Sequence, residues 1–144
     1  MKKIKYDKLS KEEQDLLLCA KDAAGHYFNP KGTRYVGAAL KTSDGTIFQG
    51  AAIRRLSTSS NTCGERMAID QALFAGKSDY ALLAIIGLNK DGSSNEPFFS
   101  CGPCRQIILE YYPDAKVNSI IVSNSDMSDI VKTDIHELLP VAYL

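Results

Sequence analysis

Apolar residues along this chain recur either every three or four positions, as in amphipathic helices, or in short runs that suit strands. The first helical pattern begins at Ser10 and Glu13, whose spacing is typical of a capping box, and continues through LLLCAKDAAGHYF. Asn29 and Pro30 then break the pattern. The apolar stripe of this predicted helix consists of Leu16, Leu17, Ala20 and Ala24.

The remaining pattern predicts a hairpin followed by alternating helices and strands. Two β-prone runs, 35–42 and 47–53, flank the turn sequence Ser-Asp-Gly-Thr, which is typical of a β-hairpin. Beyond it we expect helices at 63–76, 102–112 and 134–139, and strands at 82–89 and 117–122. Strands separated by helices favour parallel pairing, whereas the hairpin adds an antiparallel edge. We therefore expect an α/β fold with a mixed sheet, in a single domain over residues 1–144.

The composition excludes several classes of function. Lys and Arg together number 17 and are balanced by 17 Asp and Glu, so the formal net charge is zero. Non-specific binding to nucleic acid or to an anionic membrane needs a basic excess, so neither is an expected partner. No run approaches the roughly 18 apolar residues of a membrane span, and the N-terminus lacks the apolar stretch of a secretory signal. We therefore expect a cytoplasmic protein whose cysteines remain reduced.

Three of the four cysteines lie at the starts of two predicted helices. This cysteine triad consists of Cys63, Cys101 and Cys104. Unpaired backbone N–H groups and the helix dipole lower the pKa of a thiol at a helix N-terminus, which provides the thiolate that a metal needs. Three thiolates without a fourth protein ligand leave one position of a tetrahedral zinc ion open, as in catalytic sites. We therefore predict that the triad binds one Zn²⁺ per chain.

Glu65 adds acid–base chemistry to this predicted metal site. Zinc lowers the pKa of its bound water to about 7, and a carboxylate beside the metal can take the water proton. The same carboxylate can pass protons to a ring nitrogen and to a departing amine. Since Cys63 and Glu65 are two residues apart, a regular helix would place them on opposite faces. We therefore predict that Cys63 caps the helix and lies before its first turn.

The charge of the predicted site calls for a nearby cation. Three thiolates and one zinc ion carry a net negative charge, which weakens the metal as a Lewis acid. A guanidinium that donates to a ligand sulfur restores part of that acidity. We assign this role first to Arg66 and then to Arg105.

Two motifs of this chain resemble those of the cytidine deaminases. Thr-Cys-Gly-Glu-Arg-Met-Ala-Ile at 62–69 and Ser-Cys-Gly-Pro-Cys-Arg-Gln at 100–106 are similar to Cys-Ala-Glu-Arg-Thr-Ala-Ile and Pro-Cys-Gly-x-Cys-Arg-Gln of that family. The match extends to Val-Gly-Ala-Ala-Leu at 36–40, Asp-Gly-x-Ile-Phe-x-Gly at 44–50 and Glu-Leu-Leu-Pro at 137–140. The resemblance therefore covers nearly the whole chain.

The resemblance implies a three-layer α/β/α domain with a mixed sheet of about five strands. It implies hydrolytic, zinc-dependent deamination of a cytosine nucleoside with release of ammonia. The cysteine triad would be the zinc ligands, Glu65 the proton shuttle, and Arg66 the residue that moderates the ligand charge. Tetrameric members of the family borrow residues from neighbouring subunits. We therefore expect a homotetramer or homodimer, in which Tyr143 covers a neighbour's site.

Several positions depart from the family pattern where the substrate sugar is bound. The nucleoside enzymes carry Asn-x-Glu after the second hairpin strand, but here Ala52 and Arg54 stand at those positions and Arg55 follows. An arginine only donates hydrogen bonds, so it suits a carboxylate or phosphate better than ribose hydroxyls. The family's Phe before Val-Gly-Ala-Ala is Arg34 here. Blasticidin S deaminases, a related branch, also lack that glutamate, and their substrate carries a sugar carboxylate. We hypothesise that Arg54 or Arg55 binds a modified cytosine nucleoside with an anionic group.

Two other functions remain open at this stage. A catalytically silent, zinc-stabilised binding or oligomerisation module would keep the cysteine triad but has no need for Glu65. A nucleic-acid editor conflicts with the neutral charge and the small size of the chain. The triad could also be buried small hydrophobes, or Cys101 and Cys104 a redox pair, and the arginines could simply be solvated. Cys19 lies among leucines and is assigned to the core.

Overall fold

A six-stranded mixed sheet forms the centre of the molecule, and its strand order is β1-β6-β5-β4-β2-β3. The computed structural model describes residues 1–30, 32, 34–89, 91, 93 and 96–143. The strands are β1 (Lys2–Ile4), β2 (Arg34–Lys41), β3 (Ile47–Ala51), β4 (Leu82–Asn89), β5 (Ile120–Ser123) and β6 (Ile130–Thr133). Strands β4 and β5 are parallel, and the other neighbouring pairs are antiparallel. The predicted mixed α/β sheet is confirmed, with six strands instead of about five.

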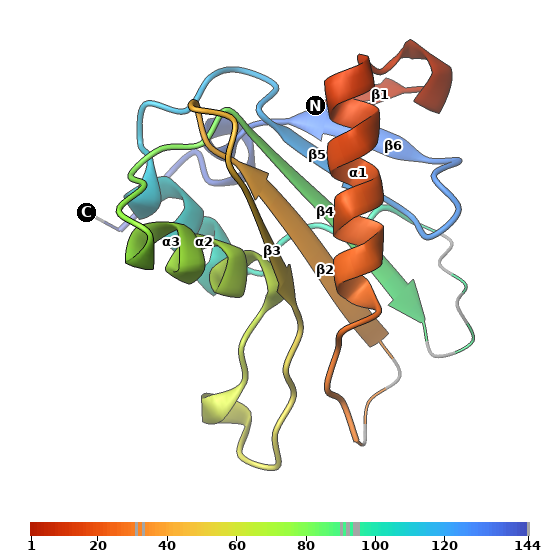
Figure 1. The fold of residues 1–144 in the computed structure, drawn as a ribbon, viewed down its shortest axis with the longest axis vertical. Helices are drawn as coiled ribbons and strands as arrows, with labels where there is room; N and C mark the ends of the chain where they lie inside the picture. The colour runs from red at the N-terminus through yellow and green to blue at the C-terminus, as the bar shows by residue number, and fades with distance from the viewer. Residues whose placement is uncertain (31, 33, 90, 92, 94–95, 144) are drawn as a thin grey trace.

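Helices cover both faces of this sheet and complete three layers (Figure 1). Helix α1 (Lys11–Ala24) lies across one face, whereas α2 (Gly64–Phe74) and α3 (Gly102–Tyr111) lie on the other together with the short α4 (Ile135–Leu138). Single 3₁₀ turns occur at Tyr6–Lys8 and Thr58–Ser60. Within the described residues, no helix combines the length and the apolar character needed to cross a bilayer.

The sheet is buried from both sides because successive residues of a strand face opposite layers. In β4, Leu83 and Ile85 belong to the core under α2 and α3, while Ala84 and Ile86 belong to the core under α1. All four side chains are completely buried. This explains why β4 reads as a continuous apolar run, which is typical of a central strand covered by helices on both faces.

Helix α1 begins where the sequence pattern predicted and ends earlier than expected. The Ser10 hydroxyl accepts from the Glu13 amide and the Glu13 carboxylate accepts from the Ser10 amide, so the capping box is present. The helix stops at Ala24 instead of continuing to Phe28. The reason is tertiary: the backbone of Phe28 pairs with Ala52 and Arg54 in the loop after β3.

The sequence pattern missed two short strands and misplaced two strand boundaries. Strands β1 and β6 were not expected, because three or four residues of mixed polarity carry little β signal until they pair with each other. Strand β5 begins at Ile120 instead of Val117, since Asn118 adopts a left-handed conformation with φ of 59°. Strand β3 ends at Ala51, after which Ile53 forms isolated bridges outside the sheet.

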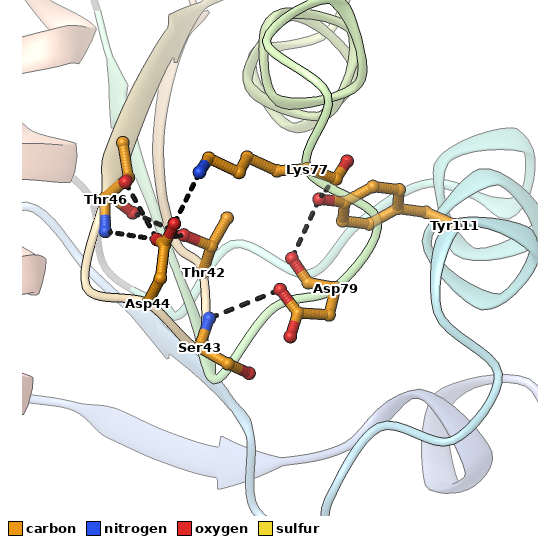
Figure 2. A network of polar contacts seen from close by, with 7 residues as sticks. All are labelled: Thr42, Ser43, Asp44, Thr46, Lys77, Asp79 and Tyr111. Carbon is orange, nitrogen blue, oxygen red and sulfur yellow. Dashed lines mark hydrogen bonds and ion pairs between the residues drawn. The ribbon is translucent and has the colours of Figure 1, made fainter.

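A polar network ties the β2–β3 turn to the segment after α2, at the end of the sheet remote from the ends of β3 and β4 (Figure 2). The Asp44 carboxylate accepts hydrogen bonds from Lys77, from the Thr42 hydroxyl, and from the amide and hydroxyl of Thr46. The Tyr111 hydroxyl donates to the Asp79 carbonyl, 2.8 Å away. The hydrogen bonds from Lys77 and the two threonines hold the pKa of Asp44 far below its usual range.

Replacing Asp44 with asparagine is expected to lower the free energy of unfolding at neutral pH. The same substitution should lower it less in acid. The pKa of Asp44 is lower in the folded than in the unfolded chain, so its ionised form stabilises the fold above the unfolded pKa of about 3.9. That contribution declines as the pH falls below this value towards the folded pKa. Urea denaturation of wild type and Asp44→Asn at pH 7, 3.5 and 2 measures the difference. A difference in stability that is equal at all three pH values contradicts this prediction.

Candidate active site

The starts of α2 and α3 lie at one end of the sheet. Strands β3 and β4 are both antiparallel to β2, so they run in the same direction and finish at the same edge. Helix α2 begins after the loop that follows β3, and helix α3 begins after the loop that follows β4. In α/β proteins ligands bind outside the carboxyl ends of such strands. The two helix N-termini therefore face a common site (Figure 1).

The local backbone places each cysteine of the triad at the opening of its helix. Cys63 is the N-cap of α2 with φ −81° and ψ 154°, and Cys101 is the N-cap of α3 with φ −69° and ψ 166°. Both are extended, and Cys104 follows in the first turn of α3. The prediction that Cys63 precedes the regular helix is confirmed. A cap conformation lets Cys63 and Glu65 face the same site although they are two residues apart.

The structure brings the three sulfur atoms together. The Sγ atoms of the triad all lie within 4.8 Å of one another. Around a tetrahedral zinc ion with Zn–S bonds of about 2.3 Å, sulfur atoms are separated by roughly 3.8 Å, so a small adjustment would suffice. Three soft thiolate donors are a ligand set that suits zinc. Cys104 is buried, Cys63 half-buried and Cys101 exposed, so the site is open to solvent on the side of Cys101.

Close backbone packing fixes the first turn of α2 against the sheet. A Cβ atom added to Gly50 of β3 would lie 2.0 Å from the carbonyl oxygen of Gly64. A Cβ on Gly64 itself would lie 3.2 Å from the carbonyl oxygen of Val36 in β2. Gly64 stands between Cys63 and Glu65. This close packing therefore fixes the positions of Cys63 and Glu65 relative to the backbone of β2 and β3.

Glu65 is buried beside the triad, with 2% of its surface exposed. Burial raises its pKa, and the negative charge of the nearby Cys63 thiolate acts in the same direction. The hydroxyl of Ser100, the residue before Cys101, lies against the Glu65 carboxyl and favours its charged form. A carboxyl whose pKa is raised in this way is suited to accept and release a proton.

A hydrogen bond between the thiols of Cys104 and Cys63 shifts their pKa values in opposite directions. Donation from the Cys104 thiol lowers the pKa of Cys63 to about 6, and the positive charge of Arg54 supports the same thiolate. The same interaction, together with burial, raises the pKa of Cys104. Without a cation the triad thus favours one thiolate, at Cys63, and keeps the proton on Cys104; a bound metal cation would displace that proton.

The cation next to the Cys63 thiol is Arg54, and the role assigned to Arg66 stays a prediction. Arg66 is exposed on the outer face of α2, and its Nε lies 3.7 Å from the carboxylate of Asp70. No hydrogen bond joins Arg66 to a sulfur atom among the described residues. Each residue of a helix is rotated by about 100° from the one before, so Glu65 facing inward turns Arg66 outward. Arg54 instead lies within hydrogen-bonding reach of Cys63.

Arg105 also has another partner than the triad. Its Nε donates to the Ser100 carbonyl at 2.8 Å and its Nη1 donates to the Leu138 carbonyl at 2.9 Å. These bonds attach the loop before α3 to helix α4. These contacts give Arg105 a structural role, and its donation to a ligand sulfur stays a prediction.

The other residues predicted to bind substrate are distributed differently from the expectation. Arg55 is tied to its own loop, because its guanidinium donates to the Ser60 carbonyl and its amide donates to Asn61. Ala52 is buried, and its amide and carbonyl are used by Val36 and Phe28.

Tyr143 is 86% exposed, although its backbone is held by Gln106.

Sequence reasoning missed two features of this site. One is the hydroxyl of Ser100, whose only signal was its place next to Cys101. The other is Arg34 at the start of β2, noticed only as a replaced aromatic residue. Arg34 lines a cavity at the same end of the sheet as the triad.

The comparisons with known proteins agree with this site. Residues 10–124, which include the whole triad and Glu65, match the family model described as the cytidine and deoxycytidylate deaminase zinc-binding region. The chain belongs to this family. Membership of this zinc-binding deaminase family makes the chain a hydrolase of C–N bonds in cyclic amidines, with zinc as its cofactor.

Individual deaminases resemble the chain over most of its length. A cytidine deaminase of Halalkalibacterium halodurans is 32% identical over 133 residues, which are 92% of this chain and 94% of that protein. A blasticidin-S deaminase of Bacillus cereus is 31% identical over 112 residues, which are 76% of each chain. The crystal structure of a cytidine deaminase from Burkholderia pseudomallei superposes with a TM-score of 0.80 at 30% identity. It covers 94% of this chain and 100% of that chain. The deaminase fold expected from the two motifs is confirmed.

Proposed function

We propose that this chain hydrolyses the exocyclic amine of a cytosine nucleoside, giving the uracil form and ammonia. The observation that carries the proposal is the meeting of three thiols, within 4.8 Å of one another, beside the buried carboxyl of Glu65. A purely structural zinc site has no need for a carboxyl at this place, so Glu65 favours an enzyme over a silent module. The names of the similar deaminases support the same reaction.

The cysteine triad is the proposed zinc-binding group. Its donor chemistry and its sulfur separations suit a zinc ion with one position left for solvent. Bound zinc supplies the Lewis acidity that makes a water molecule nucleophilic at neutral pH. The Arg54 guanidinium next to Cys63 offsets part of the negative charge of three thiolates. Arg54 thus takes the role that the sequence had suggested for Arg66.

Glu65 is the proposed proton shuttle. Its carboxylate accepts a proton from the attacking water and delivers it to the ring nitrogen next to the reacting carbon. The water oxygen becomes bonded to that carbon. Glu65 then carries the second water proton to the amine, so the C–N bond breaks and ammonia leaves. Burial keeps bulk water away from this transfer, and the Ser100 hydroxyl steadies the carboxyl between steps.

A panel of cytosine compounds tests this proposal. Purified protein containing one zinc per chain is expected to convert at least one of cytidine, deoxycytidine, CMP and blasticidin S. The ultraviolet change to the uracil form and the ammonia released should be equimolar. Protein stripped by a chelator should lose the activity and regain it with zinc. If zinc-loaded protein releases no ammonia from any of the four, the chain is the silent module.

The assembly and location of the chain complete the proposal. We propose a single domain over residues 1–144 that forms a homo-oligomer, with a homotetramer expected, in the reducing cytoplasm. Exposed apolar side chains support assembly: Phe74 is 97% exposed at the end of α2, next to a hollow of about 390 Å³ lined by Phe48 and Met67. The exposed Tyr143 is available to a neighbouring subunit. Sedimentation equilibrium that finds only monomer at micromolar concentration would remove the role of Tyr143.

A further inference from the structure

A second cavity lies at the same end of the sheet as the triad. Its volume is about 300 Å³, and its polar lining includes Arg34, Asn89 and Glu96, with Phe98 and Phe99 forming the apolar wall. This volume is at the lower end of the range of small-molecule sites. It is large enough for the part of a nucleoside that extends beyond the base.

The cavity adjoins the reacting centre on the same face of the sheet. Arg34 and Val36 are two residues apart on β2, so their side chains point to the same face, roughly 7 Å apart along the strand. The Val36 carbonyl lies against Gly64, between Cys63 and Glu65. On the other side, Phe99 is followed directly by Ser100, whose buried hydroxyl lies close to the Glu65 carboxyl. A substrate with its amine at Glu65 therefore has this cavity within reach.

An aromatic ring holds the guanidinium of Arg34 in place and leaves its positive charge unneutralised. Its Cζ lies 5.2 Å from the ring centroid of Phe98, in a cation–π arrangement. Phe98 is in turn packed onto Gly87, where a Cβ atom would lie only 2.5 Å from the Phe98 side chain. Stacking on an aromatic face leaves the N–H edge of a guanidinium available for a ligand. Arg34 is also solvent-exposed.

The other four arginines of the chain are engaged elsewhere. Arg54 lies on the Cys63 thiol, and Arg55 folds onto its own loop. Arg66 lies near Asp70, and Arg105 joins two backbone carbonyls. The anion partner that the sequence assigned to Arg54 or Arg55 is therefore better sought at Arg34.

We propose that Arg34 binds an anionic group, a carboxylate or a phosphate, on the sugar of the cytosine nucleoside. This inference rests on the proposed function, since it places the base of the substrate at Glu65. Asn89 lies in the same lining and offers amide donors to the same group. Glu96 is the one carboxylate among the described lining residues.

Kinetics with three probes test this assignment. The probes are cytidine, CMP and cytidine with a carboxylate at the 5′ carbon, and the measured quantity is the ratio of kcat/KM for each anionic probe to that for cytidine. Arg34→Gln is expected to lower this ratio about 10- to 100-fold, since a hydrogen bond to a charged group is lost. Arg34→Lys should give an intermediate value. The probe with the larger loss in Arg34→Gln identifies the anion.

The outcomes separate this inference from the proposed function. If wild type is active and Arg34→Gln leaves both ratios unchanged, Arg34 does not bind the anion. Calorimetric binding of the same three probes to zinc-loaded protein gives the comparison independently of turnover. A protein without deaminase activity on any probe overturns the proposed function, while a loss of CMP or carboxylate binding confined to Arg34→Gln would still support the anion site. Zinc content and circular dichroism confirm that the variants are folded.

Discussion

Replacing Glu65 with glutamine is expected to lower kcat by about 10³- to 10⁴-fold while the protein keeps its zinc. Glutamine has nearly the size of glutamate, so the buried position remains filled and the triad is undisturbed. What is lost is the group that takes the water proton and returns it to the nitrogen atoms, and such proton transfer contributes typically 10²- to 10⁴-fold. Because Glu65 serves more than one transfer, the upper part of that range applies. Initial rates of ammonia release, with zinc measured on the same samples, provide the measurement.

A matched substitution elsewhere shows whether the effect belongs to the site. Glu13 is also buried, with 8% exposure, but it caps α1 and pairs with Lys132 on the other side of the sheet. Glu13→Gln should lower the melting temperature and leave kcat close to that of wild type. If Glu65→Gln retains more than about a tenth of wild-type kcat, its carboxyl is not the proton shuttle.

Replacing Cys104 with serine is expected to remove zinc and activity together. Cys104 is the buried member of the triad, and a serine oxygen at this place is a shorter, harder and less acidic donor than sulfur. Loss of a group that only supports a ligand costs about 10- to 100-fold in metal affinity, so loss of a ligand itself should cost more. Zinc content after gel filtration and titration with a coloured chelator measure the affinity. Added zinc should raise the melting temperature of wild type and not that of the variant, because only wild type gains binding energy.

Cys19 provides the control for this cysteine substitution. It is half-buried on α1 and packs on the face of the sheet opposite to the triad. Cys19→Ser should keep one zinc per chain and unchanged kinetics. A Cys104→Ser protein that also keeps one tightly bound zinc would place the metal elsewhere.

The loop after β3 contributes a positive charge to the surroundings of the triad. Arg54, which supports the Cys63 thiolate, comes from the loop after β3 and not from α2. The antiparallel bridge between Ile53 and Thr62 closes this loop directly before Cys63. Substitutions in this loop will therefore affect zinc affinity even where they contact no substrate.

Much of the candidate site could be predicted from the sequence because its geometry is local. A cysteine that caps a helix, a carboxyl two residues later, and a second pair of cysteines in a helical first turn are each specified within four residues of chain. The capping box of α1 and the apolar run of β4 were predictable for the same reason. Short-range backbone preferences decide such features before the chain has packed.

The sequence by itself predicted the ligand set and the proton-transferring glutamate, and it determined the family and the order of the elements from α1 to β5. Only the tertiary structure decided which arginine meets the Cys63 thiolate, which one faces a cavity beside Glu65, and that β1 pairs with β6. These contacts join segments far apart in the chain. They depend on how the sheet and its loops pack as a whole, and no spacing within a motif records that packing.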